Sequence, residues 1–281
     1  MKKPVIISQW KRIVYYPSNH LNDFCLFQGN DGLWHCIGIM GTGTWESETK
    51  LFHSFGENLD CLFTNADPIL TPNFPEDGNI YQQKHAPFVV VENHIYHLFY
   101  RRPMGTIMCA KTSDLFVFNC LGEEVFTRRD ARDVCIIKAN DEYILYYCQS
   151  EIVDGTPYSC IIARRSKTLS DWDEPMLVYA DSEKRADHSY LESPFVVGAE
   201  EGYYLFIRHR LRDDDVKTVV LFSKDPLDFR NRGWLQELND VHAAEIVKDK
   251  DEFYIARVSF YEGKNNSGGD GWIELARLRF D

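Results

Sequence analysis

The sequence predicts an all-β protein, a five-bladed β-propeller with four-stranded blades. A pattern of an apolar run, a polar turn and an aromatic-rich run occurs five times along the chain, about 50 to 60 residues apart. Each interval has room for about four strands of ordinary length. Four-stranded sheets that repeat around an axis make a propeller, whereas the alternative, an all-β sandwich, explains the strands but not the fivefold spacing.

The first run of each repeat predicts a short buried strand, and the run after the turn predicts a strand returning beside it. The first runs are residues 24–27, 87–91, 134–137, 194–197 and 245–247. The returning runs, enriched in Tyr, Phe and β-branched residues, are 33–40, 95–100, 143–148, 203–208 and 253–258. Turns such as Asn30-Asp31-Gly32 contain residues that tolerate positive φ, as hairpin tips require.

A third strand is predicted after each of the first four hairpins, and each ends in a polar turn with an aromatic residue, such as Ser170-Asp171-Trp172. The fifth repeat stops at its third strand, residues 272–280. Residues 12–16 have strand composition and precede the first repeat, so pairing them with the last blade would close the ring and remove an exposed edge. We therefore predict a single five-bladed propeller domain over residues 1–281.

Composition and charge exclude several classes of function. A net charge of −12 opposes binding to phosphate backbones, so no nucleic-acid partner is predicted. The apolar run at residues 5–7 is too short for a signal peptide or a membrane span, so we expect a cytoplasmic protein with no membrane partner. The sequence leaves the oligomeric state open.

The eight cysteines follow no CxxC spacing, and six of them lie within apolar runs. These six are Cys25, Cys36, Cys109, Cys135, Cys148 and Cys160. This placement favours reduced, buried thiols over a disulfide framework or a zinc site.

A two-residue polar slot stands at the start of each buried first strand. The slots are Asn22-Asp23, His85-Ala86, Arg132-Asp133, Glu192-Ser193 and His242-Ala243. Because the first strand of every blade lines the propeller axis, these positions should converge at one mouth of the central channel. Most of the 43 acidic residues are expected on the surface, but Asp23, Asp133 and Glu192 directly precede hydrophobic strands, where charge is costly unless it is hydrogen-bonded or used.

Three converging carboxylates suit the cleavage of a glycosidic bond. That reaction needs one protonated carboxylic acid to donate to the leaving oxygen and one ionised carboxylate to activate water or attack the anomeric carbon. Mutual repulsion and desolvation would raise the pKa of one group and leave another charged. The trio therefore predicts a glycosidase.

The residues around this trio resemble the five-bladed propeller glycoside hydrolases of families 43 and 32. The resemblance rests on Asn22-Asp23-Phe24, Arg132-Asp133-Val134 and Glu192-Ser193-Pro194, which match the families' Asp-Pro-like, Arg-Asp-Pro-like and Glu-x-Pro-like motifs in order. Phe24 and Val134 stand where proline is usual. The resemblance implies Asp23 as general base or nucleophile, Asp133 as pKa modulator and Glu192 as general acid.

Six further residues are predicted to bind substrate at the same mouth: Asn22, His85, Arg132, Arg208, His242 and Trp45. For the histidines the alternative is a hydrogen-bonded structural role, and for Arg208 a strand-edge ion pair. Trp45 lies in a loop where its ring can stack on a sugar face. No metal ligands are predicted and no cofactor is required, although similar enzymes suggest Ca²⁺ in the central channel.

We predict hydrolysis of a small neutral oligosaccharide at an arabinofuranosyl, xylosyl or fructosyl linkage, with inversion at the anomeric carbon. A retaining β-fructosidase-like enzyme is the alternative in mechanism. A glycoside phosphorylase would need a basic phosphate pocket, for which Arg132, Arg208 and His242 are candidates. A non-catalytic sugar-binding propeller is the alternative of another class.

Overall fold

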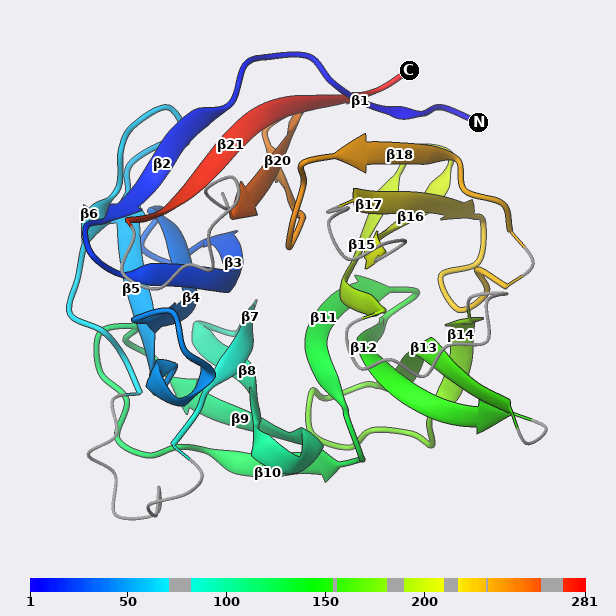
Figure 1. Ribbon diagram of the computed structural model, residues 1–281, viewed down its shortest axis with the longest axis horizontal. Helices are drawn as coiled ribbons and strands as arrows, with labels where there is room; N and C mark the ends of the chain where they lie inside the picture. The colour runs from blue at the N-terminus through cyan, green and yellow to red at the C-terminus, as the bar shows by residue number, and fades with distance from the viewer. Residues whose placement is uncertain (71–81, 154–155, 181–189, 210–216, 231, 259–269) are drawn as a thin grey trace.

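The computed structural model is a ring of five β-sheets around a central axis (Figure 1). It describes residues 1–281 except 71–81, 154–155, 181–189, 210–216, 231 and 259–269. Each of the first four sheets has four antiparallel strands in sequence order, with its first strand nearest the axis. The five-bladed propeller predicted from the repeat is confirmed.

The first two blades contain β3 (His20–Gln28), β4 (Trp34–Gly41), β5 (Lys50–Gly56) and β6 (Thr64–Asn65), then β7 (His85–Glu92), β8 (Ile95–Arg102), β9 (Thr106–Thr112) and β10 (Glu123–Thr127). The third and fourth contain β11 (Arg132–Ala139), β12 (Glu142–Val153), β13 (Thr156–Ser166) and β14 (Met176–Ala180), then β15 (Leu191–Ala199), β16 (Gly202–His209), β17 (Lys217–Ser223) and β18 (Gln236–Asn239). Among the described residues, the short 3₁₀ turns η1 (Trp45–Ser47) and η3 (Pro103–Gly105) lie in connections between strands.

The fifth blade is built from both ends of the chain. β19 (Glu245–Asp249), β20 (Glu252–Val258) and β21 (Gly271–Phe280) are joined by β2 (Lys11–Tyr16) and β1 (Pro4–Ile6), both antiparallel to β21. The predicted N-terminal closing strand is therefore confirmed. The sequence analysis did not foresee β1, which extends this sheet to five strands.

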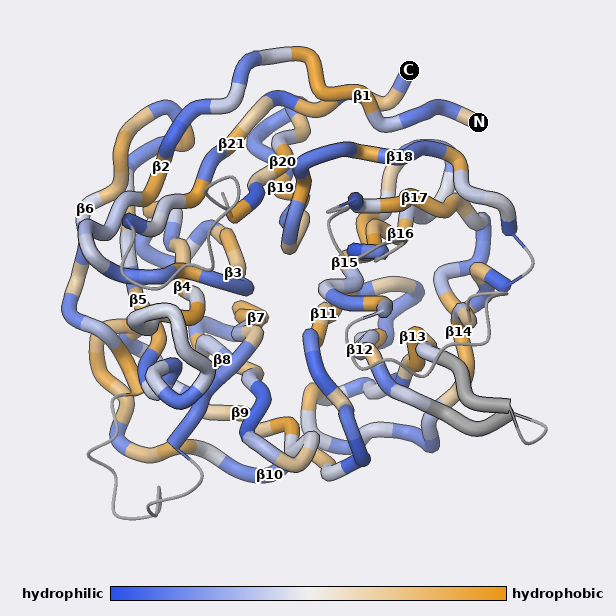
Figure 2. Tube along the Cα trace, in the orientation of Figure 1, coloured by the Kyte–Doolittle hydropathy of each residue, from blue (hydrophilic) through white to orange (hydrophobic). Residues whose placement is uncertain are grey.

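Hydrophobic stretches recur in every blade (Figure 2), and the buried side chains form five clusters, one at each interface between neighbouring blades. The cluster of blades five and one contains Val14, Phe24 and Ile273, for example. Burial of apolar area therefore holds each blade against its two neighbours. The slots at the inner strands are fixed in space by these five interfaces.

Polar contacts also link the inner strands across blades. The Cys135 sulfur accepts a hydrogen bond from the Val196 amide at 3.4 Å, and Glu245 accepts one from the Leu26 amide. All eight cysteines are free and the six predicted to be buried are buried. Burial raises the pKa of the Cys25, Cys36, Cys135 and Cys148 thiols, and that of Cys109 to about 12, so these five act as neutral core residues.

No helix among the described residues has the length and apolar character to cross a bilayer.

Candidate active site

β-Bulges at the inner strands turn the slot residues toward the axis. The register shifts between Asn22 and Phe24 in β3, and the corresponding shifts follow His85 in β7, Arg132 in β11 and Glu192 in β15. The second slot residue of four blades has a positive φ, namely Ala86 (44°), Asp133 (58°), Ser193 (49°) and Ala243 (50°). A bulge re-aims the side chains at a strand start, which is why such positions occur beside functional sites.

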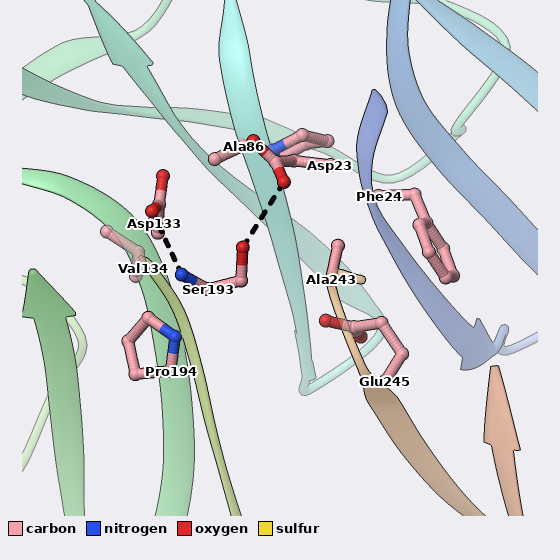
Figure 3. A pocket seen from close by; sticks show the side chains of 10 residues that line it. Asp23, Phe24, Ala86, Asp133, Val134, Ser193, Pro194, Ala243 and Glu245 are labelled. Atoms are coloured by element: carbon pink, nitrogen blue, oxygen red, sulfur yellow. Dashed lines mark hydrogen bonds between the residues drawn. The ribbon is translucent and has the colours of Figure 1, made fainter. Parts of the chain in front are cut away.

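Two of the three predicted carboxylates, Asp23 and Asp133, line one small pocket at the axis together with Ser193 and Glu245 (Figure 3). The pocket has a volume of about 20 Å³, enough for roughly one water molecule. Its lining residues come from all five blades, since Ala86 and Ala243 also border it. Residues from separate repeats are therefore neighbours, as the slots predicted.

Ser193 and Arg132 connect the three carboxyl groups. The Ser193 amide donates to Asp133 Oδ2 at 3.0 Å, and the Ser193 hydroxyl donates to Asp23 Oδ1 at 3.3 Å. Arg132 Nε lies 3.7 Å from Asp133 Oδ2 and also 3.7 Å from Glu192 Oε1. Glu192 thus belongs to the same cluster although its side chain stands beside the small pocket.

Glu192 is paired with arginine. Arg208 faces it across the β15–β16 ladder, and Arg208 NH1 donates a hydrogen bond to Glu192 Oε2. Burial raises the pKa of Glu192, Arg208 and Arg132 lower it, and the Asp133 charge raises it, with a net increase. Arg208 therefore forms an ion pair, and its partner is Glu192, the residue that the motif resemblance implies as general acid.

Asp23 has a different environment. Burial raises its pKa well above the ordinary value, and the charges of Asp133, Glu192 and Glu48 raise it further. His242 lies beside it, with Nε2 3.8 Å from Asp23 Oδ1. Burial and the Arg208 charge lower the pKa of His242, so this imidazole is neutral and gives Asp23 little charge compensation.

The other predicted substrate residues lie around this cluster with varied exposure. His242 Nε2 is 3.2 Å from Asn22 Oδ1, and both His242 and His85 are nearly buried. Trp45 is 48% exposed and its ring lies 5.4 Å from the His85 ring. Arg132 is only 3% exposed and donates to the backbone carbonyl of Leu191 at 2.8 Å, so it contacts the protein more than the solvent.

The structure adds residues that the sequence analysis missed. Glu48, in the connection after η1, is buried, with Oε2 2.9 Å from His85 Nε2 and Oε1 3.9 Å from His20 Nε2. Arg101 pairs with His85 across β7 and β8 as Arg208 pairs with Glu192, and its NH1 lies 3.4 Å from His85 Nδ1. Arg101 occupies the same position in its repeat as Arg208 does, so the sequence repeat could have identified it. No sequence pattern could have identified Glu48.

Glu245 is a further buried acid of the channel. It begins β19 where the other blades carry apolar residues, and burial raises its pKa well above the usual value. Within the described part of the chain, no group of three or more His, Cys, Asp or Glu side chains is arranged to hold a metal ion.

No protein-family model and no curated protein sequence matches this chain. Solved structures do. A thermostable family-43 glycoside hydrolase has a TM-score of 0.73 and 17% identity, with 94% of this chain and 91% of that one covered. The family-43 enzyme of Xanthomonas citri in complex with xylose has a TM-score of 0.69, 16% identity and coverages of 94% and 90%.

An endo-arabinase from Bacteroides thetaiotaomicron has a TM-score of 0.68 and 13% identity, with 96% of this chain and 98% of that one covered. At sequence identities this low, the similarity to these structures is one of backbone fold. The chain therefore has the five-bladed propeller fold of these glycoside hydrolase structures, as the resemblance in its motifs led us to expect.

Proposed function

We propose that this protein is a glycoside hydrolase that cleaves terminal or short-chain pentosyl or fructosyl linkages in small neutral oligosaccharides. The observation that carries the proposal is the convergence of Asp23, Asp133 and Glu192 from three different blades, with Ser193 and Arg132 connecting them. Fold neighbours that include an arabinase and a xylose complex support a pentose as the sugar.

In the proposed mechanism Glu192 is the general acid and Asp23 the general base. This assignment follows the motif resemblance, since the pKa values of both carboxyl groups are raised in the resting protein. Glu192 gives its proton to the glycosidic oxygen as the bond from that oxygen to the anomeric carbon breaks. Asp23 takes a proton from a water molecule that attacks the anomeric carbon on the opposite face, so the configuration inverts. The Asp133 carboxylate stabilises the positive charge that develops on the sugar and raises the pKa of both partners.

The Glu192 charge raises the pKa of Asp23, and the Asp133 charge raises the pKa of both Asp23 and Glu192. In the resting protein Arg208 favours the charged form of Glu192. Glu192 must therefore take up a proton from solvent, against the Arg208 charge, before it can pass that proton to the leaving oxygen. Arg208 is thus assigned to both substrate binding and control of the acid.

The test is release of nitrophenol from arabinofuranosides, xylosides, galactosides and glucosides, together with sucrose and fructan hydrolysis. Glu192→Gln and Asp23→Asn should each lower kcat by about 10² to 10⁴-fold. Glu274→Gln is the matched control, since Glu274 is a half-buried carboxylate in an ion pair with Arg257 in the fifth blade. Equal activity in all four proteins would refute the assignment.

The same assays separate the alternatives. Proton NMR of the first-formed sugar anomer distinguishes inversion from retention. Turnover that depends on inorganic phosphate would identify a phosphorylase, which the pairing of Arg132 and Arg208 with Glu192 disfavours. Sugar binding without turnover would identify a non-catalytic propeller.

We assign no step to a metal. Calcium takes six to eight oxygen ligands, and the described residues contain no group of three or more His, Cys, Asp or Glu side chains arranged to hold a metal ion. We further propose that the protein acts in the cytoplasm on imported oligosaccharides, since its eight free cysteines suit a reducing compartment. Cell fractionation tests that location.

A further inference from the structure

Ser193 has contacts that its place in the sequence did not reveal. It directly follows Glu192, its amide donates to Asp133 Oδ2 at 3.0 Å, and its hydroxyl donates to Asp23 Oδ1 at 3.3 Å (Figure 3). Ser193 thus donates hydrogen bonds to the carboxylates of Asp133 and Asp23, and it is the next residue in the chain after Glu192.

The backbone conformation of Ser193 accounts for the hydrogen bond of its amide to Asp133, but not for the presence of a hydroxyl at this position. Ser193 has φ 49° within the bulge of β15, and that conformation directs its amide toward the third blade. Ala86 and Ala243 hold equivalent bulge positions with φ 44° and 50°. Because alanine adopts this conformation in two other blades, the bulge does not need a hydroxyl, and the Ser193 hydroxyl is available for the neighbouring carboxylate.

We propose that Ser193 is a positioning residue whose hydroxyl orients the Asp23 carboxylate and supports its negative charge. This inference rests on the proposed role of Asp23 as general base. A hydrogen bond donated to a carboxylate favours its charged form, and Asp23 needs such a donor because burial and three neighbouring carboxylates all oppose its ionisation.

The kinetic test uses Ser193→Ala and Ser193→Gly. Loss of the donor should raise the pH of the acid limb of kcat/KM by about one unit, and kcat/KM below that limb should fall about tenfold. The two variants should agree, since both lack the hydroxyl. If glycine restores the wild-type profile and alanine does not, backbone strain rather than the hydroxyl matters and the proposal is wrong.

The matched control is Ser223→Ala. Ser223 is a buried serine on β17 of the same blade, and its hydroxyl accepts from the Asp225 amide at 3.1 Å. This variant removes a buried hydroxyl away from the carboxylates, so it should lower Tm without moving the acid limb. An equal shift of the limb in both variants would indicate general loosening and would overturn the proposal.

A measurement without turnover separates this inference from the proposed function. Carbon-13 NMR of proteins labelled at the aspartate side-chain carboxyl, with Asp23 assigned through Asp23→Asn, follows the ionisation of Asp23 directly. The Asp23 titration midpoint should move upward in Ser193→Ala even if no sugar is cleaved, in which case only the hydrolase assignment fails. An unchanged midpoint would overturn the Ser193 proposal whether or not the protein is active.

Discussion

Replacing Arg208 by glutamine should move the pH dependence of hydrolysis to higher pH. Arg208 lowers the pKa of Glu192, to which it donates a hydrogen bond, and also lowers that of Asp23. Removal of its charge raises both. Since the general acid must be protonated, the alkaline limb follows the pKa of Glu192 upward, while the acid limb follows the pKa of Asp23.

The magnitude follows from the ion pair. Unit charges about 4 Å apart attract by about 4 kcal/mol at an effective dielectric constant near 20, which corresponds to about 3 pKa units. Arg208 and Glu192 are 16% and 21% exposed, and Arg132 stays 3.7 Å from Glu192, so part of this effect is screened or replaced. We expect the alkaline limb to rise by about 1 to 2 units.

The assay is kcat/KM against pH for wild type, Arg208→Gln and the control Arg257→Gln. Arg257 faces Glu274 across β20 and β21 as Arg208 faces Glu192, and their side chains are 17% and 18% exposed. The control should lower stability and leave both limbs in place. If the acid limb of Arg208→Gln moves further than the alkaline limb, Glu192 is the base and Asp23 the acid, and the proposed roles are reversed.

Three further predictions concern binding, stability and metal. Trp45→Ala should raise KM about tenfold with kcat unchanged and little change in Tm, because the ring is half exposed and placed for stacking; steady-state kinetics and thermal unfolding check this. Glu245→Gln should gain Tm over wild type as pH rises above about 4.5. The folded-state pKa of Glu245 is raised by burial, so its stabilising contribution is present at low pH and lost as it ionises, by about 1.4 kcal/mol per pH unit; calorimetry at several pH values that shows a constant Tm difference would contradict it. Treatment with a chelator should leave turnover unchanged, and loss of activity restored by Ca²⁺ would refute the metal-free mechanism.

The fold was predictable because the strand-forming runs of the sequence recur in the same order in every blade. Each blade repeats an apolar inner strand and an aromatic return strand, so five weak signals support one another. β1 escaped prediction because three residues carry no periodicity. Its Val5 is 38% exposed, and only the long partner β21 orders this segment as a strand.

The sequence allowed the three members of the carboxylate cluster to be predicted, but not the charged groups that surround each of them. Asp23, Asp133 and Glu192 stand out because charge is costly at the start of a buried strand. Which of them meets arginine depends on side-chain directions at the bulges, which sequence spacing does not specify. Glu48 reaches the site through the connection after η1, whose path is set by tertiary packing.

The closure of the fifth blade by β2 and β21 has a consequence for biosynthesis. β2 leaves the ribosome roughly 250 residues before its partner, and at about 5 to 20 residues per second it waits tens of seconds as an unpaired edge. The nascent chain, rather than the finished ring, is therefore the aggregation-prone species. Lys3 and Asp281 are joined by two backbone hydrogen bonds. A circular permutant that links them and opens at the tip of the β11–β12 hairpin would make β21 and β2 neighbours in sequence and shorten that wait to a few seconds.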